Sequence, residues 1–328
     1  TSLSQVTIPS SVTSIGNNAF SGCSSLKQIE IPSSVVSIEE SAFEGCLLLS
    51  QVTIPSSSSS LISIGECAFY KCKSLNKMQI PSSVVSIGYK AFSDCSSMTK
   101  ITISPSIMMI KFNTFSGCSS LTEISIPSSV TTIGSHAFEG CISLSRLSIP
   151  SSVKKIEDKA FYGIVSVNLS NDMTIIPKNS FKGCSSLRQV TIPSSVVSIC
   201  EFAFEGCSSL EQVTIPSSVT SIGEKAFEGC SLLKQISIPS SVTEIGEGVF
   251  EECSLLSKVL IPSSLSLIAN SAFCFCLSLK QISIPSSVIE IGPFAFYGCS
   301  SLKQVSIPSS TTSIMDYAFD ECSSLQKI

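Results

Sequence analysis

Residues Leu210–Leu232 spell LEQVTIPSSVTSIGEKAFEGCSL, and this 23-residue phrase recurs with small changes along the whole 328-residue chain. Aligned on the apolar residue that ends the VTI motif, the phrase occurs fourteen times, from Ile8 to Ile307. A strict period of this length indicates a repeat protein and outweighs the two domains that chain length alone would suggest. We therefore expect residues 1–328 to form a single solenoid domain. Both ends fall within a repeat, so we expect this domain to be excised from a longer protein.

Two spacings within the phrase predict its local structure. Val213 and Ile215 alternate with polar neighbours, which indicates a half-buried strand ended by Pro216. The apolar residues that follow are three or four positions apart, which predicts one face of a helical or 3₁₀ turn; they are Val219, Ile222, Ala226, Phe227 and Cys230. One strand and one turn cannot bury their apolar faces alone. We therefore expect an α/β solenoid in which stacked repeats share a core and a parallel β-sheet.

Two departures interrupt the period. Three extra serines lie between Pro55 and Leu61, and we expect them to loop out at one edge. The unit from Phe161 to Phe181 is three residues short, which removes one core Leu and one core Cys. We predict a local kink or a tightened turn across residues 161–170.

Thirteen of the sixteen cysteines occupy one position of the repeat: Cys23, Cys46, Cys72, Cys95, Cys118, Cys141, Cys184, Cys207, Cys230, Cys253, Cys276, Cys299 and Cys322. A residue type fixed at one position of a period is most simply a small buried hydrophobe, because a free thiol packs like one. We expect reduced, buried thiols. Cys67, Cys200 and Cys274 lie outside this column and are the better candidates for reactivity.

The phrase resembles the BspA-like, Treponema-type class of leucine-rich repeat. The match is carried by Leu210, Val213, Ile215, Pro216, Ser218, Val219, Ile222, Gly223, Ala226, Phe227 and Cys230. Common leucine-rich repeats place an Asn after the strand, whereas this chain has a serine column: Ser11, Ser34, Ser83, Ser129, Ser195, Ser218 and Ser241. We expect the serine hydroxyls to satisfy the backbone of the turn instead.

The resemblance implies a right-handed leucine-rich-repeat horseshoe of about fourteen repeats, with a concave parallel sheet and short helical or 3₁₀ turns on the convex side. It also implies a non-catalytic binding or adhesion module on a cell surface or in a secreted protein. Its partner would be a protein or glycoconjugate at a host or microbial surface. The alternative is a cytoplasmic scaffold for protein–protein interaction, which abundant unpaired thiols and the lack of disulfide-closed caps would suit.

The composition argues against several other functions. The net charge is −4 and basic residues are scattered, unlike a nucleic-acid-binding surface. No apolar run approaches the ~18 residues that span a membrane. His136 is the one histidine, and we expect it to be a solvated side chain. Cys274 and Cys276 have no further ligands nearby to complete a metal site. We expect no catalytic residue, no metal and no cofactor.

Two surfaces are candidates for binding a partner. One is a row of four charged strand positions, Lys77, Lys100, Glu123 and Arg146, which forms either a stack of ion pairs or a docking patch. The other gathers apolar residues at normally polar positions: Ile62, Val85, Tyr89, Met108, Met109 and Phe112. These residues bind a partner, mediate self-association, or shield an adjacent edge. Asn168 heads the sequon Asn168-Leu169-Ser170 and could carry a glycan.

Overall fold

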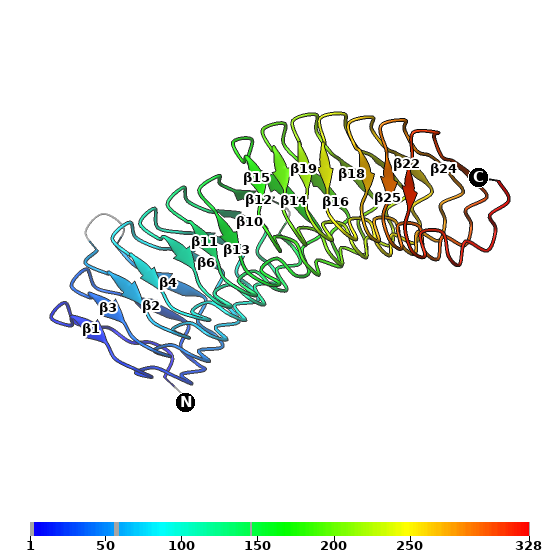
Figure 1. Ribbon diagram of the computed structural model, residues 1–328. Coiled ribbons are helices and arrows are strands. Elements are labelled where there is room, and N and C mark those ends of the chain that lie inside the picture. Colours follow the sequence, from blue (N-terminus) through cyan, green and yellow to red (C-terminus); the bar gives the residue numbers. More distant parts are fainter. Residues whose placement is uncertain (1–2, 56–58, 145, 328) are drawn as a thin grey trace. The chain divides into compact units, whose positions relative to one another are not determined.

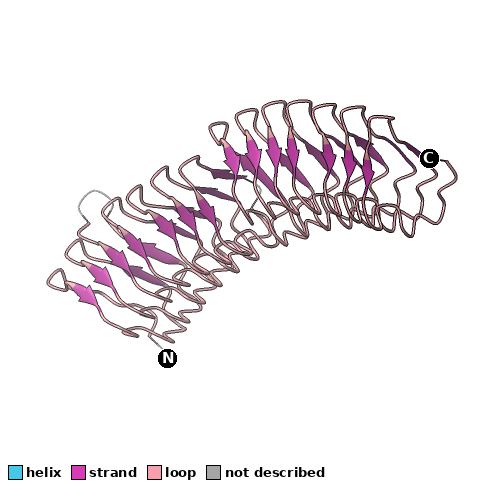
Figure 2. Ribbon diagram, in the orientation of Figure 1, coloured by secondary structure: helices cyan, strands magenta, loops and turns pink. Residues whose placement is uncertain are grey.

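The computed structural model describes residues 3–55, 59–144 and 146–327, and the chain divides into two compact units, Thr1–Asn168 and Leu169–Ile328. Within each unit the repeats stack one after another, and each strand pairs in parallel with its counterpart in the next repeat (Figure 1). The described residues contain strands and turns but no helix (Figure 2). The predicted parallel solenoid is therefore confirmed, whereas the predicted helical or 3₁₀ turns are wrong.

The first strand of each repeat is the one that the alternating pattern predicted. In the first unit these strands are β2 (Gln28–Glu30), β4 (Gln51–Thr53), β6 (Lys77–Gln79), β8 (Lys100–Thr102), β10 (Glu123–Ser125) and β12 (Arg146–Ile149), followed by β14 (Ser166–Leu169) at the unit boundary. In the second unit they are β16 (Gln189–Thr191), β18 (Gln212–Thr214), β20 (Gln235–Ser237), β22 (Lys258–Leu260), β24 (Gln281–Ser283) and β26 (Gln304–Ser306). In the three-residue strands the middle residue is buried, or half-buried at Val213 of β18, and the two flanking residues are exposed.

The second strand of each repeat was not predicted. In the first unit these two-residue strands are β1 (Ser14–Ile15), β3 (Ser37–Ile38), β5 (Ser63–Ile64), β7 (Ser86–Ile87), β9 (Met109–Ile110), β11 (Thr132–Ile133) and β13 (Lys155–Ile156). In the second unit they are β15 (Ile175–Ile176), β17 (Ser198–Ile199), β19 (Ser221–Ile222), β21 (Glu244–Ile245), β23 (Leu267–Ile268), β25 (Glu290–Ile291) and β27 (Ser313–Ile314). Each contributes one buried Ile to the core, apart from the more exposed Ile314 of the last strand.

Hydrogen bonding explains why the segment after the second strand is not a helix. The amides of Ala226, Glu228 and Cys230 each donate to the carbonyl three residues earlier. The amides that alternate with these, of Lys225, Phe227 and Gly229, donate instead to backbone carbonyls of the next repeat at 2.8–3.0 Å. Lys225 and Gly229 have φ of 50° and 68°, a left-handed conformation that a right-handed helix cannot contain. The three-and-four spacing of apolar residues thus arises from successive tight turns.

Two columns of side chains form the centre of the core. The phenylalanine rings stack nearly parallel on their neighbours, with centroids 5.2–5.7 Å apart, from Phe20 to Phe161 in the first unit and from Phe181 to Phe319 in the second. Each column cysteine from Cys207 onward donates its thiol to a Phe carbonyl of the preceding repeat, as Cys230 Sγ does to Phe204 O at 3.3 Å. Of the thirteen column cysteines, all but Cys23 are buried, and none forms a disulfide. This confirms the predicted role of the column.

The serine column also behaves as predicted. Ser218 Oγ donates to Val196 O at 2.6 Å, and Ser241 Oγ donates to Val219 O at the same distance. Equivalent bonds at Ser34, Ser83, Ser129 and Ser195 join a turn to the carbonyl one repeat earlier. Serine therefore replaces the Asn of common leucine-rich repeats by satisfying the backbone of the neighbouring turn.

The structure describes the short unit between Phe161 and Phe181 in full but only part of the serine insertion between Pro55 and Leu61. In the short unit, Ile164 is buried and its amide donates to Phe161 O at 3.1 Å, so Ile164 takes the place of the missing cysteine. The unit boundary falls between Asn168 and Leu169, and the kink predicted at residues 161–170 stays a prediction. Residues 56–58 of the serine insertion lie outside the described residues.

Candidate binding surfaces

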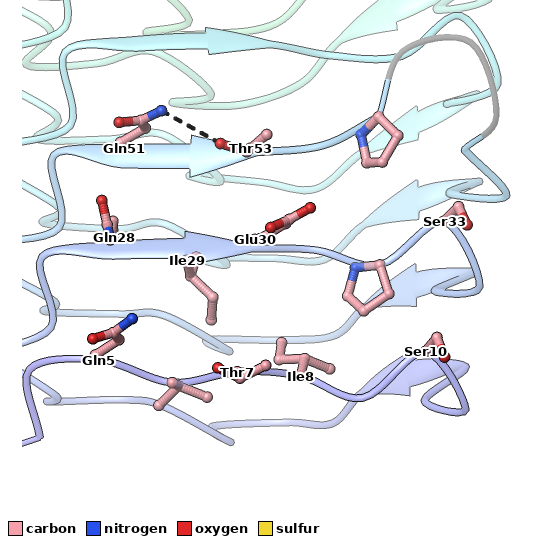
Figure 3. A pocket seen from close by; sticks show the side chains of 13 residues that line it. Gln5, Thr7, Ile8, Ser10, Gln28, Ile29, Glu30, Ser33, Gln51 and Thr53 are labelled. Atoms are coloured by element: carbon pink, nitrogen blue, oxygen red, sulfur yellow. Dashed lines mark hydrogen bonds between the residues drawn. The ribbon is translucent and has the colours of Figure 1, made fainter.

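The face formed by the three-residue strands is mainly a polar ladder. In the first repeats Gln5, Gln28 and Gln51 lie in one row, and Thr7, Glu30 and Thr53 lie in the next (Figure 3). Gln51 Nε2 donates to Thr53 Oγ1 at 3.5 Å, within a single strand. Such a ladder supplies hydrogen-bond donors and acceptors to solvent and contributes a few tenths of a kcal/mol per cross-strand pair.

The charged row lies on this face of the first unit. Lys77, Lys100, Glu123 and Arg146 begin β6, β8, β10 and β12 and are paired residue to residue across neighbouring strands. Lys77, Lys100 and Glu123 are exposed, and no ion pair joins these three side chains. The side chain of Arg146 lies outside the described part of the chain. Because neighbouring strands are ~4.8 Å apart, Lys77 and Lys100 place two like charges side by side.

Four apolar side chains at one position of successive repeats form what we call the apolar ladder: Val36, Ile62, Val85 and Met108. Backbone hydrogen bonds align it, with Ile62 N donating to Val36 O at 2.8 Å and Val85 N donating to Ile62 O at 2.9 Å. Exposure rises along it from 39% at Val36 to 65% at Met108. Ile62, Val85 and Met108 were predicted from the sequence, and the structure adds Val36.

The other predicted apolar residues lie close to the ladder but have different surroundings. Met109 is exposed in β9, while Tyr89 and Phe112 occupy the same position of neighbouring turns. Lys111 Nζ lies 5.6 Å from the centre of the Tyr89 ring, and Lys90 Nζ lies 6.0 Å from that of Phe112. Tyr89 and Phe112 therefore already have cationic neighbours within the chain, which leaves Met109 and the apolar ladder as the unpartnered apolar surface.

The side chain of His136 contacts two other side chains of the chain. Its Nδ1 lies 2.8 Å from Glu139 Oε2 within one turn, and its ring meets the Phe112 ring edge-on at 5.8 Å. His136 also has a φ of 55° and is partly buried, so it is a turn residue with two neighbours. Among the described residues no group of His, Cys, Asp and Glu has the arrangement of a metal site.

The three cysteines outside the column have environments that disfavour the thiolate. Burial raises the pKa of Cys67 and Cys200, and the charges of Glu66 and Glu201 add to this effect. Burial and the nearby Glu251 and Glu252 carboxylates raise the pKa of Cys274 to about 12. Since the thiolate is the reactive form, none of these three sites has the electropositive surroundings of a reactive cysteine.

One cluster was missed from the sequence. Phe275, Phe294, Tyr297 and Tyr317 lie in the turns of the second unit and contact one another. The signal was present, because Phe294 and Tyr317 stand immediately before the Ala-Phe pair, where most repeats have Lys, Asn or Ser. Phe275 likewise replaces the glycine found at that position in most repeats. The contacts between the rings could not be derived from the repeat pattern alone.

The 23-residue period, the parallel strands and the stacked phenylalanine and cysteine columns define a leucine-rich-repeat solenoid. More narrowly, the chain belongs to the BspA-type leucine-rich repeat family, whose model matches residues 1–61, 56–167, 163–277 and 266–328. No curated protein matches the chain in sequence.

Several solved structures are similar to the chain. A leucine-rich cell surface protein from Faecalibacterium prausnitzii is 30% identical, with a TM-score of 0.50 over 97% of this chain and 82% of that one. A leucine-rich repeat protein from Bacteroides ovatus is 31% identical, with a TM-score of 0.55 over 82% of each chain. A leucine-rich repeat protein from Eubacterium ventriosum is 25% identical, with a TM-score of 0.51 over 93% of this chain and 78% of that one. The chain thus resembles bacterial leucine-rich repeat proteins, one of them described as a cell surface protein. No helix within the described chain is long and apolar enough to cross a membrane.

Proposed function

We propose that this chain is the non-catalytic binding module of a cell-surface or secreted protein and that it adheres to a protein or glycoconjugate partner at a host or microbial surface. The family and the similar Faecalibacterium cell surface protein support the class of function. The observation that carries the proposal is the apolar ladder, because it is a run of exposed apolar side chains where the repeat normally has a polar one.

The composition of this repeat position supports a binding role for the ladder. The same position is threonine in six other repeats: Thr13, Thr131, Thr174, Thr220, Thr243 and Thr312. In the second unit the exposed apolar residues at this position, Val197 and Ile289, are isolated between Ser or Thr neighbours. Single exposed apolar residues are ordinary, whereas a contiguous run marks an interaction surface. An edge-shielding role is disfavoured because Val85 and Met108 stay more than half exposed.

The charged row offers a second contact in the same unit. Lys77 and Lys100 are exposed neighbours without an ion-pair partner among the described side chains, so an acidic group of a partner would relieve their mutual repulsion. An acidic protein segment or a carboxylated or sulfated glycan has this chemistry. Asn168 is exposed in β14, so a glycan at this sequon would project from the strand face of its repeat.

A binding screen of the 328-residue chain against matrix proteins, glycans and intact cells tests this function. Met108→Ser with Met109→Ser should weaken the interaction selected by the screen at least tenfold, and so should Lys100→Glu with Arg146→Glu if the charged row takes part. The matched control is Val197→Ser, an exposed apolar residue outside the run. Thermal melting of each variant should stay close to that of the unaltered chain. A large fall in melting temperature for Met108→Ser with Met109→Ser would place these residues in the core and overturn the proposal.

The state of the cysteines favours one alternative, a cytoplasmic scaffold for protein–protein interaction. None of the sixteen cysteines, all within the described residues, forms a disulfide, whereas structural disulfides are common in small secreted domains. Antibody labelling of intact against permeabilised source cells separates the two. Labelling of intact cells supports the surface module, whereas labelling only after permeabilisation supports the scaffold.

A further inference from the structure

Four aromatic side chains on the turns of the second unit form a continuous cluster, which we call the aromatic platform: Phe275, Phe294, Tyr297 and Tyr317. Phe294 and Tyr317 are stacked with ring centroids 5.0 Å apart. Tyr297 meets Phe275 edge-on at 5.3 Å and Phe294 at 5.7 Å. Phe275, Phe294 and Tyr317 are exposed, Tyr317 to 60%. The platform therefore presents aromatic surface to solvent across three successive turns.

The backbone under the platform has the left-handed conformation of the repeat's turns. Phe275, Phe294 and Tyr317 have φ of 55°, 54° and 57°, a left-handed conformation that bulky residues rarely adopt. A β-carbon at Gly298 would lie 2.6 Å from the Phe275 ring, so the ring can pack against this turn only because residue 298 has no side chain. The same left-handed conformation recurs at the equivalent positions of other repeats, for example at Asn18, His136 and Lys225, so the repeat's turn geometry sets the direction in which the platform rings point.

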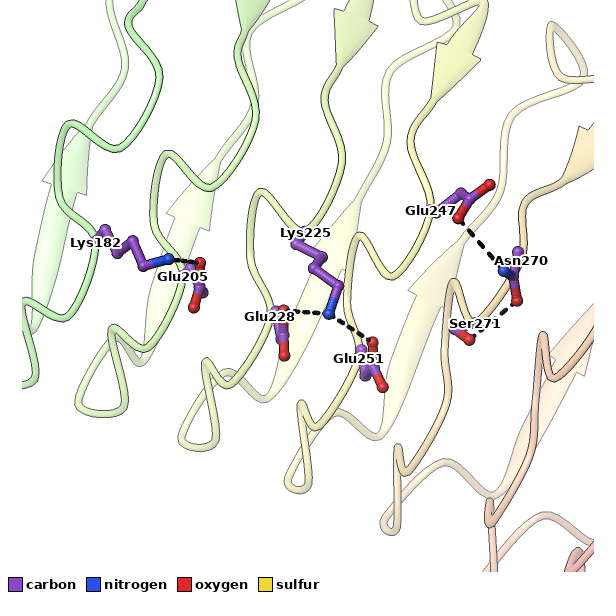
Figure 4. Close-up of polar contacts among 8 residues, drawn as sticks. All are labelled: Lys182, Glu205, Lys225, Glu228, Glu247, Glu251, Asn270 and Ser271. Atoms are coloured by element: carbon purple, nitrogen blue, oxygen red, sulfur yellow. Dashed lines mark hydrogen bonds and ion pairs between the residues drawn. The ribbon is translucent and has the colours of Figure 1, made fainter. Parts of the chain in front are cut away.

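The turns that carry the platform, taken with the turn before them, contain acidic groups and no cation. From the second strand to the column cysteine, residues 245–253, 268–276, 291–299 and 314–322 include six carboxylates: Glu247, Glu251, Glu252, Asp316, Asp320 and Glu321. The preceding turns are different, because there Lys182 pairs with Glu205 at 2.8 Å and Lys225 pairs with Glu228 at 3.1 Å and Glu251 at 3.7 Å (Figure 4). Lys225 is the last cation of these turns before residue 322.

The acidic groups lie against the aromatic rings. Hydrogen bonding to the Glu321 carboxylate raises the pKa of the Tyr297 phenol, and Asp320 adds to this effect. On the other side, the Glu251 and Glu252 carboxylates lie near Cys274, the residue before Phe275, and their charges help to raise the pKa of its thiol after burial, the largest cause. The platform is thus bordered by carboxylates at both ends.

An equivalent aromatic residue within the same unit indicates what such a ring binds. Phe202 has the same position in its turn as Phe294 and the same left-handed conformation, with φ of 56°. Its ring lies 5.3 Å from Lys178 Nζ and 5.0 Å from Lys182 Nζ. Lys178 and Lys182 stand 24 and 20 residues before Phe202. The residues at the same spacing before Phe294 are Asn270 and Cys274, so Phe294 has neither lysine. Among the described residues, no lysine or arginine lies over any ring of the platform.

We propose that the aromatic platform is a second binding site that receives lysine or arginine side chains from a basic segment of a partner protein. The exposed ring faces attract a cation through their quadrupoles, and arginine also stacks flat on them. The bordering carboxylates neutralise the same charge. A neutral sugar could also stack on the rings, but it would supply no cation to the acidic groups of residues 314–322, which are Asp316, Asp320 and Glu321. The proposal concerns a surface and a ligand chemistry different from those of the apolar ladder.

Fluorescence anisotropy of the full 328-residue chain with a fluorescein-labelled peptide that carries three arginines tests the proposal. The matched probe carries citrulline at these positions, which keeps the planar hydrogen-bonding group and removes the charge. We expect saturable binding of the arginine peptide at about 50 mM salt, much weaker binding at about 500 mM salt, and no binding of the citrulline peptide.

Phe294→Ser with Tyr317→Asn should raise the dissociation constant about tenfold, because each exposed cation–π contact is worth a factor of about two to five. Ser271 and Asn179 already occupy this position of the repeat, so the variant should fold, and circular dichroism checks this. Phe202→Asn is the matched control and should change binding less than twofold. The proposal is overturned if the arginine peptide does not bind, if the citrulline peptide binds equally, or if Phe294→Ser with Tyr317→Asn binds like the unaltered chain. It is likewise overturned if the platform binds a neutral oligosaccharide such as chitopentaose instead of the peptide.

Discussion

The stacked phenylalanines lead to the most direct prediction about stability. Phe227 is fully buried, and its ring stacks on Phe204 at 5.2 Å and on Phe250 at 5.5 Å. Truncation to alanine removes the ring from both neighbours at once, and the stacked turns leave little freedom for the gap to close. We therefore expect Phe227→Ala to disrupt two interfaces between repeats.

The magnitude follows from burial and stacking. A fully buried Phe replaced by Ala typically costs about 3–5 kcal/mol, and a stacked aromatic pair contributes about 0.5–1.5 kcal/mol beyond area burial. Because Phe227 has two stacked neighbours, we expect a loss near the upper end, about 4–5 kcal/mol. Phe202 lies in the preceding repeat, is half-buried and contacts Lys178 and Lys182, so Phe202→Asn should cost about 1–2 kcal/mol, less than Phe227→Ala.

Urea unfolding followed by far-ultraviolet circular dichroism measures both variants. Since repeat proteins can unfold in segments, hydrogen exchange resolved by peptide should accompany it and should show the lost protection centred on residues 204–250. A loss below about 1.5 kcal/mol for Phe227→Ala, or one no larger than that of Phe202→Asn, would refute the view that the phenylalanine column holds the repeats together.

Further predictions concern the thiol and serine columns. Burial raises the pKa of Cys46 to about 11 and those of Cys118 and Cys184 to about 12, so the unfolded chain releases these protons first as pH rises. The contribution of these thiols to stability should thus be constant below about pH 8.5 and fall above it, by up to about 1.4 kcal/mol per pH unit for each buried thiol. Cys118→Ala should reduce this slope in a pH series of urea titrations, and an unchanged slope would contradict the assignment. Ser218→Ala removes the 2.6 Å bond to Val196 O and should cost about 1 kcal/mol in the same assay. Ser217→Ala, at an exposed neighbour, should change stability by less than about 0.5 kcal/mol, and equal effects would contradict the role of the serine column.

The sequence was sufficient to predict the features of the fold that depend on burial. The alternation at Val213 and Ile215, the constant Phe and the constant Cys predicted the strand, the parallel stack and the buried thiols because each repeat can bury its apolar groups only against another repeat. The turn geometry was mispredicted. Lys225 and similar residues adopt a left-handed conformation because their amides bond to the next repeat, and this constraint leaves no mark on apolar spacing.

The candidate sites could be predicted only in part, for a similar reason. Met108 and Val85 were identified because they break a polar column, and their exposure depends only on their position in the repeat. Two features that depend on where side chain ends lie were not predictable. Lysines lie over Tyr89 and Phe112, and the rings of Phe294 and Tyr317 stack. The repeat period gives the position of each residue within its repeat. The contacts between side chains at different positions depend on the geometry of the turn, which the period does not give.

We infer that the consensus residues fold the chain and that residues departing from the consensus bind the partner. Replacing the apolar ladder with the threonine of other repeats is the most direct test of this inference. The variant Ile62→Thr, Val85→Thr, Met108→Thr should melt within about 2 °C of the unaltered chain, because these side chains are exposed. Its binding to the surface partner selected by the screen should fall at least tenfold. Undiminished binding, or a melting temperature lower by about 8 °C or more, would contradict the account by showing that the ladder is either inert or part of the core.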